Sequence, residues 1–453
     1  TRGVQMELTV GGVAESAAQL PGAAPQHQHG HHHDHHHHHD HRSLPDVEAI
    51  LAGLPVSAWV AEQARAVYGR IAAAEAAAHG VPVRQVHFHE VGALDAIGDV
   101  VGCCMLLELT RRCNLECPVC YASAGKCGDD PSIEEIERQY DFLMAHGGPF
   151  NIQLSGGEPT LREDLPEIIW LGRQKGFTFF QLNTNGIRLA AEPDYAKSLK
   201  AAGLNTVFLQ FDGMSDAVYE ALRGRPLLRE KLAAIESCAA AGLGIVLVPV
   251  IAPGVNEEEA GGILRLAMTR MPYVRGVHFQ PLSYFGRYAL KRAERPVTIP
   301  RMLRLIEKQT EGMMKYADFC GGGAESPYCS FHASYMRRGD GSLRLLGRRG
   351  GSCCATSDDS RSSVAGQWSW AEWDTEAAQK KSGAETASLD EFLEYARRNT
   401  FAVSGMVFQD AYDLDLERLM RCHICEVDPR HGMVPFCAYN LTDPEGLALY
   451  REP

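Results

Sequence analysis

Three cysteines stand close together in LLELTRRCNLECPVCY, the segment that covers residues 106–121. Cys113, Cys117 and Cys120 have the spacing C-x3-C-x2-C and follow a short apolar run that is typical of a buried strand. Three thiolates on one tight loop can bind three irons of a [4Fe-4S] cluster, which leaves the fourth iron for a small-molecule ligand. Cys127 is close enough in sequence to be a rival fourth ligand. The spacing therefore predicts a catalytic iron–sulfur site in which these three cysteines are the metal ligands.

A zinc knuckle is the alternative interpretation of the same loop. Zinc sites usually combine one C-x2-C pair with a second such pair or with a pair of histidines. No second pair lies close to this loop in the sequence. We therefore expect iron and sulfide here rather than zinc.

A second motif, Gly156-Gly157-Glu158, follows another strand-like run at residues 150–154. The cysteine triad and this motif together resemble the radical S-adenosylmethionine (SAM) enzymes over about residues 104–290. The resemblance implies that the open iron binds the amino and carboxylate groups of SAM and that Glu158 accepts the SAM amino group. It also implies that an electron from the cluster cleaves SAM to methionine and a 5'-deoxyadenosyl radical, which takes a hydrogen atom from a substrate.

Strand-like and helix-like runs alternate over the same region, which predicts parallel strands joined by right-handed crossovers. The expected strands are the run before the triad and residues 150–154, 178–183, 206–211, 244–250 and 276–280. The expected helices are residues 132–146, 165–175, 193–202, 228–241 and 257–271. A capping box of Ser132 and Glu135 begins the first helix. The pattern indicates an α/β fold with a partial (β/α)6 barrel, as the resemblance also implies.

Polar residues follow several of these strands, where ligands of such folds bind. Gly156 and Gly157 allow the backbone to come close to a ligand beside Glu158. The other candidates for contacts to SAM or to the edge of its pocket are Asn183, Asn185, Asp212 and Gln280. Asn-Gly and Asp-Gly are also common turn dipeptides, so a turn is the alternative for the motifs at residues 183–186 and 212–213. Arg223 and Arg225 either meet a carboxylate of SAM or substrate, or are solvated.

Composition excludes several classes of protein. The formal net charge of −13 argues against a nucleic-acid-binding surface, which needs a basic face. No apolar run has the roughly 18 residues of a membrane span, and we find no signal peptide. We expect a cytoplasmic protein in an anaerobic cell, because oxygen destroys an exposed iron. The 14 cysteines are then better explained as cluster or metal ligands than as disulfides.

The N-terminal region carries a different signal. Eleven of the 19 histidines lie in residues 26–41, a tract that suits nickel, zinc or copper and that we expect to be disordered. A purification tag is the alternative, although the interspersed Gln, Gly and Asp favour a natural metal-binding loop. His87 and His89 alternate in VHFHEVGALD beside Glu90. Residues 1–103 are similar to part of the LarC family of nickel-insertion proteins, which implies possible nickel binding and a metallochaperone as the alternative function.

Cysteines return near the C-terminus. The segment MRCHICEVDPRHGMVPFC and the earlier YCSFHASY predict a second ligand set of Cys329, Cys422, Cys425 and Cys437, with Cys320 as the alternative to Cys329. Four thiolates can hold zinc or an auxiliary [4Fe-4S] cluster, and we favour the cluster. The C-terminal motifs resemble the TrsS-type radical SAM (seleno)proteins and, more distantly, the archaeal tetraether synthases that join lipid chains. That resemblance implies a small-molecule or lipid-like substrate and a low-potential electron donor such as ferredoxin or flavodoxin.

These patterns predict four regions. They are a His-rich disordered segment (1–42), a LarC-like α/β fragment (43–103), the radical SAM partial barrel (104–290) and a Cys-rich α+β region with an auxiliary cluster (291–453).

Overall fold

The computed structural model describes most of residues 104–346 and 398–443, with gaps at 127–129, 147, 289–292, 322–325, 327, 421 and 423. It also describes residues 9–10, 13–14 and 42–53, isolated positions between 62 and 88, and residues 395, 448 and 450. The predictions for the His-rich tract, for His89 and for Cys127 lie outside the described residues.

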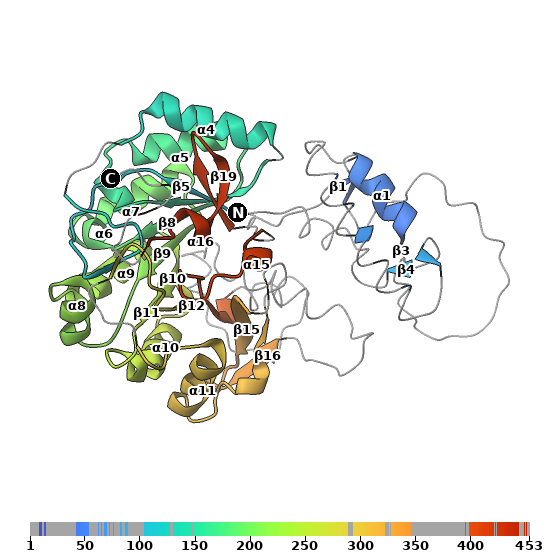
Figure 1. The fold of residues 1–453 in the computed structure, drawn as a ribbon. Coiled ribbons are helices and arrows are strands. Elements are labelled where there is room, and N and C mark those ends of the chain that lie inside the picture. Colours follow the sequence, from blue (N-terminus) through green and yellow to red (C-terminus); the bar gives the residue numbers. More distant parts are fainter. Residues whose placement is uncertain are drawn as a thin grey trace, which may run out of the picture.

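A large parallel sheet is the centre of the fold (Figure 1). Each of the six expected strands is present, and they lie side by side in chain order: β5 (Cys104–Glu108), β7 (Asn151–Ser155), β8 (Phe180–Thr184), β9 (Thr206–Gln210), β10 (Gly244–Val248) and β12 (Val274–Pro281). The short strand β11 (Val250–Ile251) also pairs with β12. All of these pairs are parallel, as the alternation of strands and helices predicts.

Helices connect the strands and cover one side of the sheet (Figure 1). They are α4 (Ile133–Ala145), α5 (Leu165–Gln174), α6 (Ile187–Ala191), α7 (Pro193–Ala202), α8 (Asp216–Arg223), α9 (Leu228–Ala240), α10 (Ala260–Thr269) and, after the last expected strand, α11 (Ile299–Gln309). The predicted capping box is confirmed, because the Ser132 side chain accepts from the Glu135 N–H and the Glu135 carboxylate accepts from the Ser132 N–H.

The C-terminal region extends the parallel sheet at both edges. Strand β17 (Thr400–Met406) pairs with β12, and β18 (Ile424–Asp428) pairs with β5, so eight parallel strands lie in the order β18-β5-β7-β8-β9-β10-β12-β17. Antiparallel strands finish the sheet: β15 (Ser330–Arg337) lies beside β17, β14 (Cys320–Gly321) and β16 (Leu343–Leu346) lie beside β15, and β19 (Gly432–Pro435) lies beside β18. The partial barrel is therefore wider than its six helix-linked strands. Sequence alternation does not reveal β17 and β18, because neither follows a predicted crossover helix.

The two faces of the strands have different environments. Met105 and Leu107 of β5 belong to the main core, which also contains Tyr140 of α4. Successive side chains of a strand point to opposite faces, so Leu106 and Glu108 lie on the inner side of the partial barrel. Leu106 belongs to a second apolar cluster that contains Phe436 of the short helix α16 (Phe436–Tyr439). The C-terminal segment thus packs inside the barrel.

The described N-terminal pieces are short. Strands β1 (Thr9–Val10) and β2 (Val13–Ala14) pair with each other, and β3 (Arg42–Ser43) pairs with β4 (His87–Phe88). Helix α1 (Leu44–Gly53) follows Ser43, whose backbone N–H and hydroxyl both donate to Asp46. In the described part of the chain, no helix combines the length and the apolar character that crossing a membrane requires.

Candidate iron–sulfur and SAM site

The three cysteines of the first motif lie on one loop at the carboxyl end of β5, where Cys117 is buried and Cys113 and Cys120 are half-buried. Cys113, Cys117 and Cys120 pack with Leu115 and Tyr219 in one cluster, so the three side chains are neighbours. Burial raises the pKa of the Cys113 thiol to about 12. A thiol with a raised pKa is neutral until a metal ion or a cation stabilises its thiolate.

The glycines of the second motif pack directly against this loop. The Gly157 N–H donates to the Thr110 carbonyl at 2.6 Å, and the Glu158 N–H donates to the Arg112 carbonyl at 2.9 Å. A Cβ on Gly157 would lie 2.2 Å from the Arg112 carbonyl oxygen, and one on Gly156 would lie 2.3 Å from that of Thr110. Only glycine permits this approach, so the motif is needed to seat the cysteine loop.

Glu158 is a buried hydrogen-bond centre. The residue is 1% exposed. Its Oε1 accepts hydrogen bonds from the Thr160 N–H and from the hydroxyls of Thr160 and Thr184. Its Oε2 accepts from the Asn185 N–H at 2.7 Å. The Asn185 side chain in turn donates to the side chain of Asn114, next to Cys113, at 2.7 Å. Glu158 thus fixes the ends of β7 and β8 against the cysteine loop.

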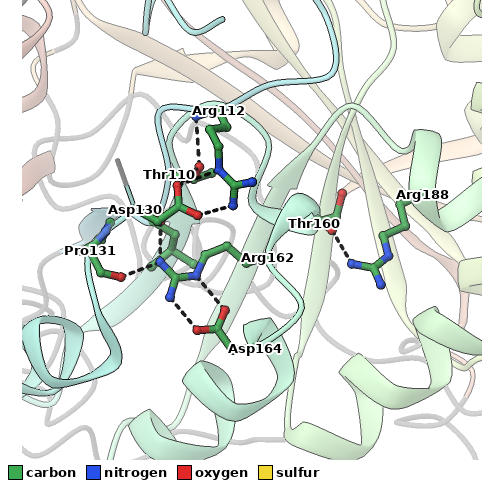
Figure 2. A network of polar contacts seen from close by, with 9 residues as sticks. Thr110, Arg112, Asp130, Pro131, Thr160, Arg162, Asp164 and Arg188 are labelled. Carbon is green, nitrogen blue, oxygen red and sulfur yellow. Dashed lines mark hydrogen bonds and ion pairs between the residues drawn. The ribbon is translucent and has the colours of Figure 1, made fainter. Parts of the chain in front are cut away.

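A second polar network contacts the residues that directly precede Cys113 (Figure 2). Arg112 and Asp130 form an ion pair, and Asp130 also accepts from the Thr110 hydroxyl at 2.5 Å. Arg162, 5% exposed, donates to the carbonyls of Leu109 and Pro131 and pairs with Asp164. In the same view, Arg188 donates to the Thr160 carbonyl at 2.7 Å. These contacts tie both motifs into one rigid edge of the barrel.

Asp212 follows β9, as the sequence predicts. It is fully buried and forms a two-pronged ion pair with Arg223, at 2.7 and 2.8 Å. Arg223 is therefore buried rather than solvated, and it also donates to the Val119 carbonyl of the cysteine loop at 3.1 Å. Arg225 is half-exposed and pairs with Glu230 at 3.2 Å.

A second arginine contacts the loop from the strand β13 (Arg287–Tyr288), which pairs with β6 (Val119–Cys120). Arg287 donates to the Cys117 carbonyl at 2.7 Å and to the Ala124 carbonyl at 2.8 Å. Gly286 has a φ of 64°, and a Cβ there would lie 2.4 Å from the Cys120 carbonyl oxygen. Both residues hold the loop backbone.

Lys231 is a functional candidate that sequence reasoning missed. This lysine of α9 has no exposed surface, and its ammonium donates to the Asn185 carbonyl at 2.5 Å and to Oε1 of Gln210 at 3.2 Å. Burial lowers the pKa of Lys231 to about 8, although the charge of Asp212 opposes this effect. The ammonium also lies over the ring of Tyr219, 5.9 Å from the ring centroid. The only sequence signal is that this lysine directly precedes the largely apolar run LAAIESCAA.

The remaining SAM candidates, Asn183 and Gln280, lie on β8 and β12, which are separated in the sheet by β9 and β10. The Asn183 side chain is half-buried and accepts from Gln181 at 3.1 Å. Gln280 is half-buried at the end of β12, and its backbone pairs with β11. Asn185, in contrast, is hydrogen-bonded both to Glu158 and to Asn114 of the cysteine loop, so the structure ties Asn185 more closely to the triad than these two residues.

Two of the four predicted C-terminal ligands pack in different apolar clusters. Cys437 is buried in the cluster that contains Leu106 and Phe436, and burial raises the pKa of its thiol to about 12. Cys425 is buried in β18 and packs with the main core. Cys320, the alternative ligand, lies with its sulfur 3.2 Å from Nε2 of His332. Among the residues that the structure describes, no three His, Cys, Asp or Glu side chains converge as ligands of a single metal ion. A cubane does not require that convergence, because each thiolate binds a different iron.

Sequence comparison identifies the family. The sequence model of the Radical SAM superfamily matches residues 107–267. The 7,8-dihydro-6-hydroxymethylpterin dimethyltransferase of Methanocaldococcus jannaschii is 34% identical over 383 residues, which cover 74% of this chain and 76% of the relative. The chain belongs to the radical SAM superfamily. It is therefore a radical SAM enzyme, and members of that family bind a [4Fe-4S] cluster and SAM.

Other similarities of this radical SAM enzyme are more limited. The GTP 3',8-cyclase of Paenarthrobacter nicotinovorans is 34% identical over 185 residues, and the chain spans about half of its length (51%). The crystal structure of Streptococcus suis SuiB bound to S-adenosylmethionine matches with a TM-score of 0.39 and 13% identity, over 50% of this chain and 54% of SuiB. The structure of methylornithine synthase (PylB) matches with a TM-score of 0.36 and 16% identity, over 59% of this chain and 74% of PylB.

The N-terminal part of this radical SAM enzyme has a second family match. A nickel insertion protein model matches residues 2–127, which overlaps the cysteine loop. The LarC-like nature of the N-terminal region is therefore confirmed, and the match extends beyond the limit of residue 103 that the sequence suggests. The more specific resemblance to TrsS-type proteins and tetraether synthases stays a prediction.

The cysteine loop fits a [4Fe-4S] cluster on chemical grounds. Its three cysteines pack in one cluster, where Leu115 and Tyr219 shield them. Cys113, Cys117 and Cys120 would each hold one iron. The edge formed by Glu158, Asn185 and Lys231 borders the same loop and offers the polar groups that a zwitterionic cofactor needs.

Proposed function

We propose that this enzyme cleaves SAM reductively at a [4Fe-4S] cluster held by Cys113, Cys117 and Cys120, and that it removes a hydrogen atom from an organic substrate. The observation that supports the proposal most is the Glu158–Asn185–Asn114 chain of hydrogen bonds, which joins the polar edge of the barrel to the cysteine loop. The cluster, when bound, supplies one electron to SAM, whose cleavage gives methionine and a 5'-deoxyadenosyl radical.

The chain's own residues would position SAM. Lys231 would hold Asn185 and Gln210 in place from below, and its buried positive charge suits a SAM carboxylate bound near them. Glu158 already accepts four hydrogen bonds, so its main task is to hold Thr184 and Asn185 in place, with one lone pair of Oε2 left for the SAM amino group. Asn183 and Gln280 would line the adjacent part of the pocket.

The substrate would lie against the inner face of the barrel. Phe208, Val246 and Val248 form a buried apolar cluster there, and the ring of His278 lies 5.9 Å from that of Phe208. This wall suits an apolar or flat organic molecule. The names of the relatives suggest a pterin-like heterocycle, and the C-terminal motifs suggest a lipid-like molecule. Both classes are small-molecule substrates to test.

The C-terminal cysteines would bind an auxiliary [4Fe-4S] cluster. The candidate ligands are Cys329, Cys422, Cys425 and Cys437, and all four are free cysteines. Such a cluster would pass electrons from a donor such as ferredoxin or flavodoxin. We propose that the enzyme works in the cytoplasm of an anaerobic cell, since both clusters are sensitive to oxygen.

Anaerobic reconstitution tests the main proposal. Iron and sulfide per chain are counted, and release of methionine from SAM is measured in the wild type and in a variant with Cys113, Cys117 and Cys120 changed to Ala. We expect the variant to lose SAM cleavage. Equal rates in the two proteins would overturn the assignment.

Nickel handling is a second candidate function, because the nickel insertion protein model matches residues 2–127. The His-rich tract at residues 26–41 would bind nickel. The test is equilibrium binding of Ni²⁺ to the full chain and to a variant in which the histidines of residues 31–39 are Ala. A variant that binds as much Ni²⁺ as the wild type would exclude this role for the tract.

A further inference from the structure

Arg223 connects a buried ion pair to the cysteine loop. The residue ends α8 and is 6% exposed, and its Nε and Nη2 donate to the two carboxylate oxygens of Asp212 at 2.7 and 2.8 Å. Its Nη1 donates to the carbonyl of Val119, which stands between two ligand cysteines, at 3.1 Å. All three guanidinium nitrogens therefore donate: two to the Asp212 carboxylate and the third to the cysteine loop.

The same guanidinium lies beside ligand positions of the loop. Val119, whose carbonyl accepts the hydrogen bond, directly precedes Cys120 and lies two residues after Cys117. The buried positive charge of Arg223 is therefore placed next to the ligand cysteines. Arg225, two residues away, is half-exposed and pairs with Glu230 instead.

Asp212 keeps the guanidinium in place. Its Oδ1 also accepts from the Val250 N–H at 3.0 Å, and its backbone carbonyl accepts from the side chain of Asn256 at 2.8 Å. The carboxylate is therefore anchored at the start of β11, the Asp212 backbone is held by Asn256, and Asp212 has no exposed surface. A buried arginine without a partner is strongly unfavourable, so the anchored carboxylate is what allows Arg223 to stay beside the loop.

The effect on a bound cluster follows from electrostatics. Reduction adds a negative charge, and hydrogen bonds to the ligand sulfurs and nearby positive charge make reduction easier. We propose that Arg223, anchored by Asp212, is a positioning residue that holds the cysteine loop and raises the reduction potential of the cluster bound there. This inference rests on the proposed cluster site. It also assigns Asp212 to the support of the cluster rather than to contact with SAM.

The test is a redox titration of the reconstituted full chain, followed by electron paramagnetic resonance, with iron counted in the same samples. The variants are R223K and R223Q, and the control is R225K. For R223K we expect the ratio of reduced to oxidised cluster at a fixed potential to fall roughly tenfold, which is about 59 mV for a one-electron couple. R223Q should show a larger fall, and R225K should match the wild type.

The outcomes separate this inference from the proposed function. A structural role alone would lower the iron content without changing the potential of the remaining cluster, and that result would overturn the inference. If R223Q does not fold, as judged by circular dichroism, the potential of R223K decides. A wild-type protein that binds no cluster would overturn the proposed function and this inference with it. A wild type with a cluster and an unchanged potential in R223K would overturn the inference alone.

Discussion

The Glu158 carboxylate accepts a hydrogen bond from the backbone N–H of Asn185 at 2.7 Å, although the two residues lie on different strand–loop connections. Through Asn185, this bond connects the glycine-rich motif to Asn114 in the cysteine loop. Substitution of Glu158 should therefore affect the SAM edge of the site without removing a metal ligand.

The first prediction concerns Glu158→Gln. The amide nitrogen of Gln would face the Asn185 N–H, and a buried donor without an acceptor costs about 1–3 kcal/mol. We expect SAM affinity to fall roughly tenfold, which corresponds to about 1.4 kcal/mol, while iron per chain stays unchanged. Equilibrium binding of SAM to the reconstituted protein measures this. Glu163→Gln is the control, since the Glu163 side chain is 83% exposed, and equal affinity of both variants would contradict the role of Glu158.

The second prediction concerns the pH dependence of SAM binding. The pKa of Lys231 is lowered to about 8, so the ammonium loses its proton as the pH rises through 8. If the protonated form binds the SAM carboxylate, the Lys231 contribution to affinity should fall roughly tenfold between pH 7 and pH 9. Binding curves of the wild type and Lys231→Met at both pH values measure it. Lys231→Met should bind SAM more weakly at pH 7, and its affinity should lack the tenfold fall between pH 7 and pH 9. If the SAM affinities of the two proteins changed with pH in the same way, Lys231 would have no role in SAM binding.

Lys231 should also influence stability. The unfolded chain holds this proton up to its ordinary pKa of 10.5, whereas the folded chain loses it near pH 8. Between these values the unfolded state binds more protons, so this group makes the free energy of unfolding rise with pH. Thermal melts at pH 7.5 and 9.5 should show a smaller gain at high pH in Lys231→Met than in the wild type. An identical gain in both proteins would show that the lysine is not deprotonated in this window.

The next prediction concerns the glycine contact below the cysteine loop. Gly157→Ala places a Cβ 2.2 Å from the Arg112 carbonyl oxygen, and overpacking of this kind costs about 1–3 kcal/mol. We expect a lower melting temperature and less iron bound per chain. Gly125→Ala is the matched control in the same loop, because nothing lies within 4 Å of its added Cβ. Calorimetry and iron analysis of the two variants compare them, and equal losses would mean that the close contact is unimportant.

The last prediction addresses the C-terminal cysteines. If Cys422 and Cys437 bind an auxiliary [4Fe-4S] cluster, changing both to Ser should lower the iron content from about eight to about four per chain. SAM cleavage with a chemical reductant should persist, since the first cluster is intact. Iron and sulfide analysis with a methionine assay measures both quantities. Unchanged iron would remove the auxiliary cluster from the proposed function.

The sequence by itself determined the parts of this protein that depend on local pattern. The spacing of Cys113, Cys117 and Cys120 and the following glycine motif predicted the radical SAM family, which the comparisons confirm. The alternation of apolar runs predicted six parallel strands, and the ends of helices such as α4 and α7 were close to those observed. These features depend on residues that are near one another in the chain.

Only the tertiary structure decided how distant residues meet. Strands β17 and β18 join opposite edges of the sheet, far from the helix-linked strands in sequence. Asp212 and Arg223, which the sequence offers as ligand contacts, form an ion pair with each other, and the Lys231 ammonium on α9 donates to the Asn185 carbonyl. The physical reason is that a buried charge is tolerated only beside a particular partner, and which partner lies beside it depends on packing between elements rather than on the order of residues along the chain.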